Sequence, residues 1–413
     1  MKSALDGAAM AEVFGRIGRD SPNGPVEVRA CRPYYMKYKP EKHCVVQYEL
    51  EFNDEDGRRR GLAHLALHSP KRAQKLAARR GIGSDGFFHP PAPYSATFVP
   101  ELSAIAQIYP VDLALPGLVE AASPERMIRR LVQKMPEQVG LDLQGCDVEL
   151  VRYKAQKRAV LRYRLSGTSV GVVYGKLRKD GGGALVHVTR AMHRAGVPTP
   201  RTLAWLSDLG MVVQAEGAGN RLSLISSGEE YERAMTPVAV ALARLHSCAA
   251  SGLPIQSPAE EARELIEAAR LIGRILPTLR VDSIELARRV VELLWETDAA
   301  TSIVHGSFHD DQVLVDEDEV TFVDVDSARA GNPLSDLGHF LSYLSAKGGE
   351  AAYARFLDAY SAAHPGVTDD YLVFEAASLL RWATLPFREL RPDWPQAIEQ
   401  RVRCAADRLK TRA

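Results

Sequence analysis

A polar loop between apolar, strand-like segments is the feature that most limits how this chain can fold. The loop, His305–Gln312 (HGSFHDDQ), is followed directly by the apolar run Val313–Val315. A second apolar run, Val320–Val323, ends at Asp324 and Asp326. Short β-branched runs bounded by polar turns predict strands. We therefore expect a β-hairpin that carries imidazole, carboxylate and amide groups before its first strand and two carboxylates after its second.

Three segments of this region resemble the aminoglycoside phosphotransferase superfamily, the kinase-like enzymes that phosphorylate small hydroxyl compounds. They are the 305–312 loop, the Asp324-x-Asp326 pair and Gly331–Gly338 (GNPLSDLG), in the family's order and at its spacing. The resemblance covers roughly residues 147–413. It implies an α+β, protein kinase-like bilobal fold, in which a five-stranded small lobe precedes a mainly helical large lobe. Helices are expected in the large lobe, for example over Pro237–Cys248, Ala259–Ile275 and Ile284–Trp295.

The resemblance also implies ATP and Mg²⁺ as cofactors and a small hydroxyl compound, such as a sugar, amino sugar or aminoglycoside, as acceptor. Gln312 and Asp324, aided by Asp326, would hold the metal, because amide and carboxylate oxygens suit Mg²⁺. For Asp324 a plain acid at a strand-end turn is the alternative. His305 is expected to pack beneath the loop as a neutral histidine. Asp336 is expected to brace the loop by hydrogen bonds, or else to cap the following helix.

One residue departs from the family's pattern. Ser307 stands where the kinase pattern H-x-D-x-x-x-x-N has its catalytic Asp. A serine is uncharged at neutral pH, so it cannot be an equivalent base. Phosphoryl transfer depends mainly on positioning and charge neutralisation, so the change would slow the reaction without necessarily abolishing it. Asp310 or Asp311, at the tip of the same loop, could supply a displaced carboxylate or could simply be solvated.

The small lobe carries the candidate nucleotide-binding groups. Lys176 is expected on its third strand, where a lysine can reach the ATP phosphates; a solvated lysine at a strand edge is the alternative. A turn without glycine carries Lys154, Lys157 and Arg158, which would either cover the phosphates or form a solvated hairpin tip. Glu216 is expected in the hinge whose backbone would pair with adenine, or in a plain turn between lobes.

An internal repeat sets the organisation of the first half. The segment Tyr38–Leu50 recurs as Tyr153–Leu165, and each copy reads as strand, basic turn, strand. One duplication does not make a solenoid. It predicts a β-rich N-terminal domain that resembles part of the small lobe. The expected domains are a cap-like domain (1–120), a helical connector (121–146), the small lobe (147–219) and the large lobe (220–413).

Composition excludes several classes of protein. Lys plus Arg and Asp plus Glu both number 52, so no global field would attract nucleic acid or an anionic membrane. The five cysteines are scattered and never form a C-x-x-C pair, which argues against zinc and disulfide frameworks. The N-terminal residues lack the apolar core of a signal peptide, and no apolar run is long enough to span a membrane. We therefore expect a cytoplasmic protein without nucleic-acid or membrane partners.

Two functions remain open from the sequence. The first is an active small-molecule kinase. The alternative is a pseudokinase that binds nucleotide or another protein, because Ser307 replaces the Asp, the helix after Lys176 offers no acidic partner, and the phosphate turn lacks glycine. The N-terminal domain could cap the cleft, bind a protein partner or form a homodimer.

Overall fold

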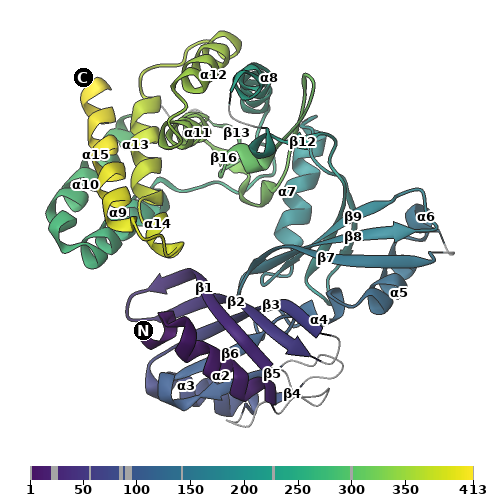
Figure 1. Ribbon diagram of the computed structural model, residues 1–413. Helices are drawn as coiled ribbons and strands as arrows, with labels where there is room; N and C mark the ends of the chain where they lie inside the picture. Colours follow the sequence, from purple (N-terminus) through teal and green to yellow (C-terminus); the bar gives the residue numbers. More distant parts are fainter. Residues whose placement is uncertain are drawn as a thin grey trace. The chain divides into compact units, whose positions relative to one another are not determined.

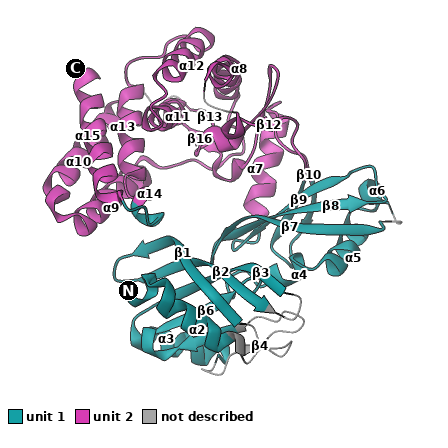
Figure 2. Ribbon diagram, in the orientation of Figure 1, with its two compact units in different colours: residues 1–182, 203–214, 387–392 teal, residues 183–202, 215–386, 393–413 magenta. Residues whose placement is uncertain are grey.

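The computed structural model describes residues 2–19, 27–54, 57–82, 87–88, 95–140, 143–225, 228–297 and 301–412. The chain forms two compact units (Figure 2). Unit 1 contains residues 1–182, 203–214 and 387–392, and unit 2 contains residues 183–202, 215–386 and 393–413. The four-part domain division expected from the sequence stays a prediction. Within the described ranges, no helix has both the length and the apolarity needed to cross a membrane.

The expected five-stranded sheet of the small lobe is confirmed (Figure 1). Its strands lie in the order β10-β11-β9-β8-β7. The order along the chain is β7 (Gly145–Lys154), β8 (Arg158–Ser166), β9 (Val172–Arg178), β10 (Thr202–Leu206) and β11 (Met211–Ala215). Strand β8 alternates buried Ala159, Leu161 and Tyr163 with less buried residues, so one face of the sheet packs on the core.

The N-terminal residues form a second sheet with the same strand order. This sheet runs β1-β2-β3-β6-β5-β4, so without the two-residue β4 its order matches β7-β8-β9-β11-β10. The repeat visible in the sequence thus covers only the first hairpin of a whole duplicated sheet. The strands are β1 (Glu27–Lys39), β2 (His43–Asp54), β3 (Gly57–Leu67), β4 (Phe87–Phe88), β5 (Ser95–Val99) and β6 (Ala104–Ile108).

The two copies share local geometry as well as topology. Glu41 and Gln156, at equivalent positions of the two basic turns, both adopt the left-handed conformation, with φ of 60° and 61°. Tyr48 and Tyr163, also equivalent, are fully buried. Their hydroxyl groups donate hydrogen bonds to helix carbonyls, to Ala4 O at 2.7 Å and to Ala121 O at 2.9 Å. Each copy therefore fixes the preceding helical segment to its sheet in the same way.

The helices of unit 1 precede or cover the two sheets. Ser123 caps α5 by accepting a hydrogen bond from the backbone N–H of Arg126 at 3.4 Å. The helices are α1 (Lys2–Leu5), α2 (Gly7–Arg19), α3 (Pro70–Arg80), α4 (Leu118–Ala121), α5 (Pro124–Lys134) and α6 (Pro136–Val139). The helix α14 (Leu385–Arg388) runs into unit 1, where Phe387 and Leu390 pack on the core of the first sheet.

Unit 2 is mainly helical, as expected for the large lobe. Its helices are α7 (Gly183–Arg194), α8 (Glu229–His246), α9 (Pro258–Ile275), α10 (Arg280–Glu296), α11 (Leu334–Ala346), α12 (Glu350–Ala363), α13 (Tyr371–Trp382) and α15 (Trp394–Arg412). The expected start of a helix at Pro237 is wrong, because Pro237 lies inside α8. Three glutamates in the first turn favour the earlier start, and packing of buried Ala234 and Met235 outweighs the loss caused by an interior proline.

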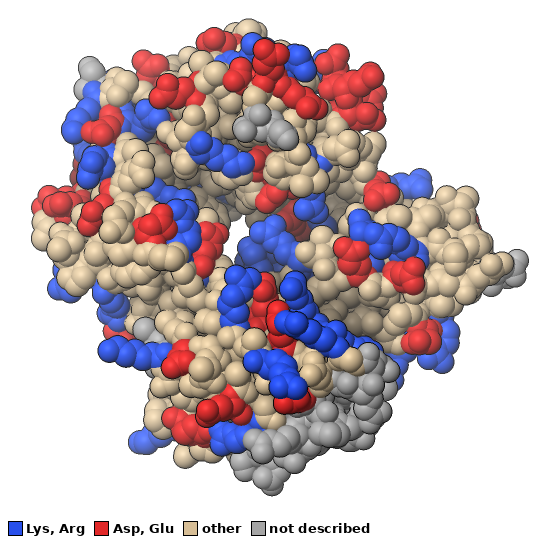
Figure 3. Space-filling view, viewed as in Figure 1, with Lys and Arg blue, Asp and Glu red and all other residues tan. Residues whose placement is uncertain are grey.

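Short strands interrupt the helices of unit 2 where the polar loop lies. The expected hairpin is confirmed as β14 (Val313–Asp316) and β15 (Glu319–Phe322), with β12 (Asn220–Arg221) paired to β14. Strands β13 (Ser302–Val304) and β16 (Arg329–Gly331) pair antiparallel on either side of this hairpin in the chain. On the surface, positive and negative side chains are interspersed over the face shown in Figure 3, as their equal numbers suggest.

Candidate active site

The loop His305–Gln312 begins where β13 ends and requires a glycine at its second position. Gly306 has φ of +77°, and an added Cβ would lie 2.0 Å from Arg329 Nη1 and 2.4 Å from Ser327 O. The Arg329 guanidinium therefore lies against the loop backbone. Any other residue at position 306 would meet both backbone strain and a steric clash.

A buried carboxylate holds the start of this loop. Asp336, on α11, is 1% exposed and accepts hydrogen bonds from His305 N at 2.5 Å and Gly306 N at 2.8 Å. At the start of α11, Asn332 Oδ1 accepts a hydrogen bond from Leu334 N at 2.9 Å, while the N-cap residue Pro333 has no side-chain cap. The Asp336 side chain thus bonds to the loop and does not cap the helix.

His305 connects the loop to the strand that ends at Asp324. Its ring is fully buried, and burial lowers its pKa, so the imidazole is neutral. A neutral ring has one N–H, and Nε2 lies 3.0 Å from Val323 O, which can only accept. His305 therefore donates to the Val323 carbonyl and fixes the backbone beside Asp324.

His246 is a functional residue that the sequence analysis missed. It lies at the end of α8, with Nε2 3.3 Å from Asp336 Oδ2 and Nδ1 2.6 Å from the Tyr360 hydroxyl. Burial by itself raises the pKa of Asp336, but the hydrogen bond and charge of His246, with His305 and Arg329, outweigh it and lower the pKa to about 2. Its partners come from elements far apart in the chain, and no local sequence pattern identifies them.

Gln312 precedes β14 and Asp324 follows β15 at the open end of the hairpin, where Val313 pairs with Phe322, and both offer oxygens suited to a divalent cation. Val323 N donates to Gln312 O at 2.9 Å, which joins the loop to the residue before Asp324. The Gln312 amide nitrogen lies 3.1 Å from His309 Nε2, while its buried Oε1 has no hydrogen-bond partner in the described chain. Asp324 adopts the left-handed conformation, with φ of 57°, and Asp326 follows in a short 3₁₀ turn. A buried amide oxygen without a partner and a carboxylate at the same end of the hairpin fit an Mg²⁺ site.

The two acids at the loop tip already have partners. Asp310 is fully buried, and Oδ2 lies 2.6 Å from Lys347 Nζ. Burial acts to raise the pKa of Asp310, but hydrogen bonds from His309, Lys347 and Tyr343 lower it below its ordinary value. Asp311 accepts a hydrogen bond from the Ser223 hydroxyl at 2.6 Å.

Lys347 is a second residue that the sequence analysis missed. Besides its ion pair with Asp310, its ammonium lies 4.6 Å from the centroid of the Tyr343 ring. This cation–π contact and the buried carboxylate hold the loop tip to the end of α11. Ser307 is only partly buried, and its hydroxyl bonds to no residue that the structure describes. The position of the missing Asp therefore remains open to solvent.

The candidate nucleotide groups from the small lobe belong to unit 1. Lys176 pairs with Val160 across β9 and β8, on the sheet face opposite the buried side chains. Lys154 and Arg158 form the last pair of the β7–β8 ladder, and Lys157 lies in the turn that they close. These four cations thus lie on one hairpin and its neighbouring strand.

Further basic residues lie near that turn. Burial lowers the pKa of Lys37 in β1, and so do the positive charges of Lys39, Lys157, Arg388 and Lys179. No ion pair to a carboxylate joins Lys37, Lys39, Lys179 or Arg388 to any residue in the described ranges. The first copy of the sheet therefore adds positive charge to the turn of the second copy.

Glu216 follows β11 at the start of unit 2. An added Cβ on the next residue, Gly217, would lie 2.6 Å from Leu314 Cδ1. The segment thus passes closely over β14, the strand that follows the loop. A glycine at position 217 leaves room for this close packing.

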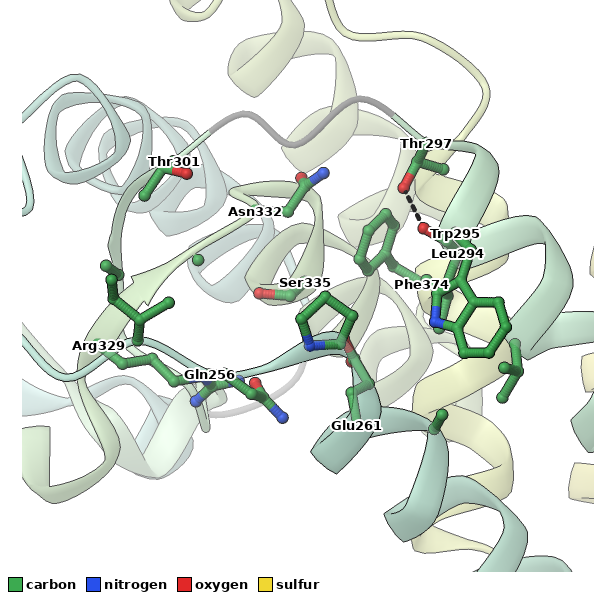
Figure 4. A pocket seen from close by; sticks show the side chains of 16 residues that line it. Gln256, Glu261, Leu294, Trp295, Thr297, Thr301, Arg329, Asn332, Ser335 and Phe374 are labelled. Atoms are coloured by element: carbon green, nitrogen blue, oxygen red, sulfur yellow. Dashed lines mark hydrogen bonds between the residues drawn. The ribbon is translucent and has the colours of Figure 1, made fainter.

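A cavity of about 360 Å³ lies between α9, α10, α13 and β16 (Figure 4). Trp295 and Leu294 form one wall, and Asn332, Ser335 and Arg329 contribute polar groups. The buried Ser335 Oγ and Arg329 Nε have no hydrogen-bond partner among the described residues. Because Arg329 also lies against Gly306, the cavity adjoins the 305–312 loop.

Comparison with known proteins agrees with this geometry. Residues 180–371 match the model of the phosphotransferase enzyme family. The match covers less than half of the chain. Among the curated proteins, no significant match was found.

Solved structures of small-molecule kinases share the fold of this protein. A choline/ethanolamine kinase family protein from Mesorhizobium loti has 17% identity and a TM-score of 0.50, over 68% of this chain and 94% of that chain. A choline kinase from Cryptosporidium parvum Iowa II has 11% identity and a TM-score of 0.50, over 70% and 95%. An amicoumacin kinase in complex with AMP-PNP, Ca²⁺ and Ami has 13% identity and a TM-score of 0.51, also over 70% and 95%. These likenesses establish the kinase-like bilobal fold.

The Asp336 brace makes the stability of unit 2 depend on pH. The folded pKa of Asp336, about 2, lies below the ordinary value of about 3.9. Its contribution to the free energy of unfolding is therefore fully present above about pH 4 and is lost as pH falls towards 2. The lowered pKa corresponds to a contribution on the order of 2 kcal/mol. We expect Asp336→Asn to destabilise unit 2 near neutral pH, and the difference from wild type to shrink below pH 4.

Urea titrations followed by tryptophan fluorescence measure this difference, because three of the four tryptophans, Trp295, Trp382 and Trp394, lie in unit 2. Asp316→Asn, at an exposed position of β14, is the matched control and should change the unfolding free energy little. A difference in the free energy of unfolding between wild type and Asp336→Asn that stays constant from pH 6 to pH 2 would contradict the proposed role of the Asp336 carboxylate in holding the loop.

Proposed function

We propose that this protein is an ATP- and Mg²⁺-dependent phosphotransferase that transfers the γ-phosphoryl group to a hydroxyl of a small molecule, with a sugar as the favoured class. One observation carries the proposal. The buried Gln312 Oε1 has no hydrogen-bond partner among the described residues, and Gln312 lies at the same end of the hairpin as the left-handed Asp324, on a loop held by Asp336 and His305. A buried amide oxygen in this state is available to bind a cation.

Each group has a specific task in this proposal. Gln312 and Asp324, aided by Asp326, hold Mg²⁺, which when bound neutralises charge on the phosphate oxygens. In unit 1, Lys176 and the cations of the 154–158 turn are the groups that we assign to the phosphates. In unit 2, the backbone of the Glu216 segment is the one that we assign to the adenine. The acceptor oxygen forms a bond to the γ-phosphorus as the bond to the β,γ-bridging oxygen breaks, and ADP leaves.

Ser307 sets the rate in this proposal. Because it cannot accept the hydroxyl proton, that proton passes to water or to a transferred phosphoryl oxygen. Asp310 is neutralised by Lys347, so Asp311 is the loop carboxylate that we consider for a displaced role. The same two facts, Ser307 and the engaged Asp310, favour a second candidate function, a catalytically impaired module that binds nucleotide or a protein.

The cavity beside the loop fits a sugar acceptor. Trp295 and Ile255 line it and are 63% and 77% exposed, which is unusual for large apolar side chains. An accessible indole offers a flat apolar face to a sugar ring. Asn332, Ser335 and Gln256 supply the polar groups that hydroxyls need. The acceptor pocket would thus combine one aromatic wall with several hydrogen-bonding groups.

Calorimetric titration with ATP tests the nucleotide site. We expect binding with Mg²⁺ that is weakened at least about tenfold by EDTA, because the phosphates need the cation for charge neutralisation. Asp324→Ala should cause a similar loss, since it removes a metal ligand. The exposed hairpin-turn variant Asp318→Ala is the control and should bind like wild type. Absence of binding at millimolar ATP in every condition would rule out the kinase reading.

Trp295→Ala tests the acceptor pocket. Loss of the aromatic wall should raise KM for a sugar acceptor on the order of tenfold, equivalent to about 1.4 kcal/mol, with a smaller change in kcat. Steady-state assays with glucose, maltose and kanamycin as probes measure this. The control is Val281→Ala, which removes an exposed apolar side chain from the same helix, α10, outside the cavity. An unchanged KM for every probe would place the acceptor elsewhere.

A further inference from the structure

The turn that carries Lys154, Lys157 and Arg158 is held by the N-terminal copy of the sheet. Ala155 N donates to Gln47 Oε1 at 2.7 Å, and Gln156 N donates to Asp112 Oδ2 at 2.7 Å. Within the turn, Lys157 N donates to Lys154 O at 3.0 Å. Every backbone N–H between the two ends of the turn therefore already has an acceptor.

The two acceptor side chains are themselves buried and fixed. Gln47, on β2, is 4% exposed, and its amide nitrogen donates to the Tyr34 hydroxyl at 2.6 Å. Asp112, in the segment after β6, is 3% exposed, and its Oδ1 accepts from Ala114 N at 2.9 Å. Both residues belong to the first copy of the sheet or to the segment that follows it, and both reach the turn of the second copy.

A chain of hydrogen bonds behind Asp112 completes the contact. The Gln107 amide lies 2.8 Å from His64 Nε2, and His64 Nδ1 lies 3.1 Å from the Tyr153 hydroxyl. That hydroxyl donates to Asp112 Oδ2 at 2.8 Å. Burial lowers the pKa of His64, so its ring is neutral and has one donor and one acceptor nitrogen, as this chain requires. The network is satisfied at each step, and such buried networks fix one geometry.

This contact is specific to one side of the duplication. The position equivalent to Gln47 in the second copy is Arg162, which forms an ion pair with Glu149 instead. Asp112 is not needed to form the β7–β8 hairpin, because the backbone ladder of β7 and β8 already closes the turn at Lys154 and Arg158. The side-chain contacts of Gln47 and Asp112 are therefore additional to what the hairpin needs to fold.

We propose that the N-terminal copy is a positioning domain for the phosphate-facing turn, and that Gln47 and Asp112 are its positioning residues. This rests on the proposed function. Successive free N–H groups in a turn can bind phosphate oxygens directly, but here two of them bind Gln47 and Asp112. The turn therefore recognises phosphate through cationic side chains on a backbone that is already fixed, which explains how it works without glycine.

Two readouts on the full-length protein test this proposal. Gln47→Met removes the acceptor while keeping the size of the side chain, whereas Gln47→Glu keeps an acceptor oxygen. In Gln47→Met we expect hydrogen exchange at Ala155 and Gln156 to accelerate at least tenfold and affinity for ATP with Mg²⁺ to fall about fivefold to tenfold. Gln47→Glu should retain slow exchange and near wild-type affinity.

Glu49→Gln is the matched control, because Glu49 lies two residues further along β2 and contacts Arg32 at the surface rather than the turn. It should change neither readout, and melting temperatures verify that all three variants fold. Unchanged hydrogen exchange in Gln47→Met would overturn the proposal that Gln47 restrains the turn. Faster exchange with unchanged ATP affinity would overturn its role in nucleotide binding. If wild type binds no ATP, the proposed function fails, and the role of Gln47 in nucleotide binding fails with it. The hydrogen-exchange data still decide whether Gln47 restrains the turn.

Discussion

The hydrogen bonds of Asp336 to the backbone of His305 and Gly306 are the interaction on which the candidate active site depends. A carboxylate that is 1% exposed is stable only when its charge is balanced, and His246 and two loop N–H groups provide that balance. His305 in turn donates a hydrogen bond to the Val323 carbonyl, which fixes the backbone next to Asp324. A single buried charge therefore fixes both the loop and the end of the strand that carries the candidate metal ligand.

The N-terminal half contains two copies of one sheet. The two sheets share strand order, the left-handed residues Glu41 and Gln156, and the buried tyrosines Tyr48 and Tyr163. Features common to both copies serve folding. The features that differ, such as Gln47 opposite Ala155 N, are those that allow one copy to act on the other.

The sequence predicted those parts of the structure that depend on neighbouring residues. Alternation of apolar residues predicted the strands around both basic turns. The spacing of the three motifs indicated that Asp336, the 305–312 loop and Asp324 belong together. The start of α8 was mispredicted, because its acidic first turn and the packing of Ala234 and Met235 outweigh the effect of Pro237.

Partners from distant parts of the chain could not be predicted. Lys347 neutralises Asp310, and Asp112 accepts from Gln156 N, yet neither pair has a signature in local sequence. The full extent of the duplicated sheet was also hidden, because only its first hairpin keeps recognisable sequence identity. These long-range contacts are nevertheless the ones that determine the charge of the loop and the geometry of the turn.

The central claim is that the 305–312 loop of this proposed phosphotransferase is held in place by Asp336 and His305, and that Ser307 stands where the catalytic carboxylate is expected. The most direct test is the rate of ATP-dependent phosphorylation of a sugar by wild type and by Ser307→Asp, measured under the same Mg²⁺ concentration. The account predicts that the variant is faster by roughly a hundred- to ten-thousand-fold, the usual contribution of a general base. A variant that binds ATP but is no faster than wild type would contradict it.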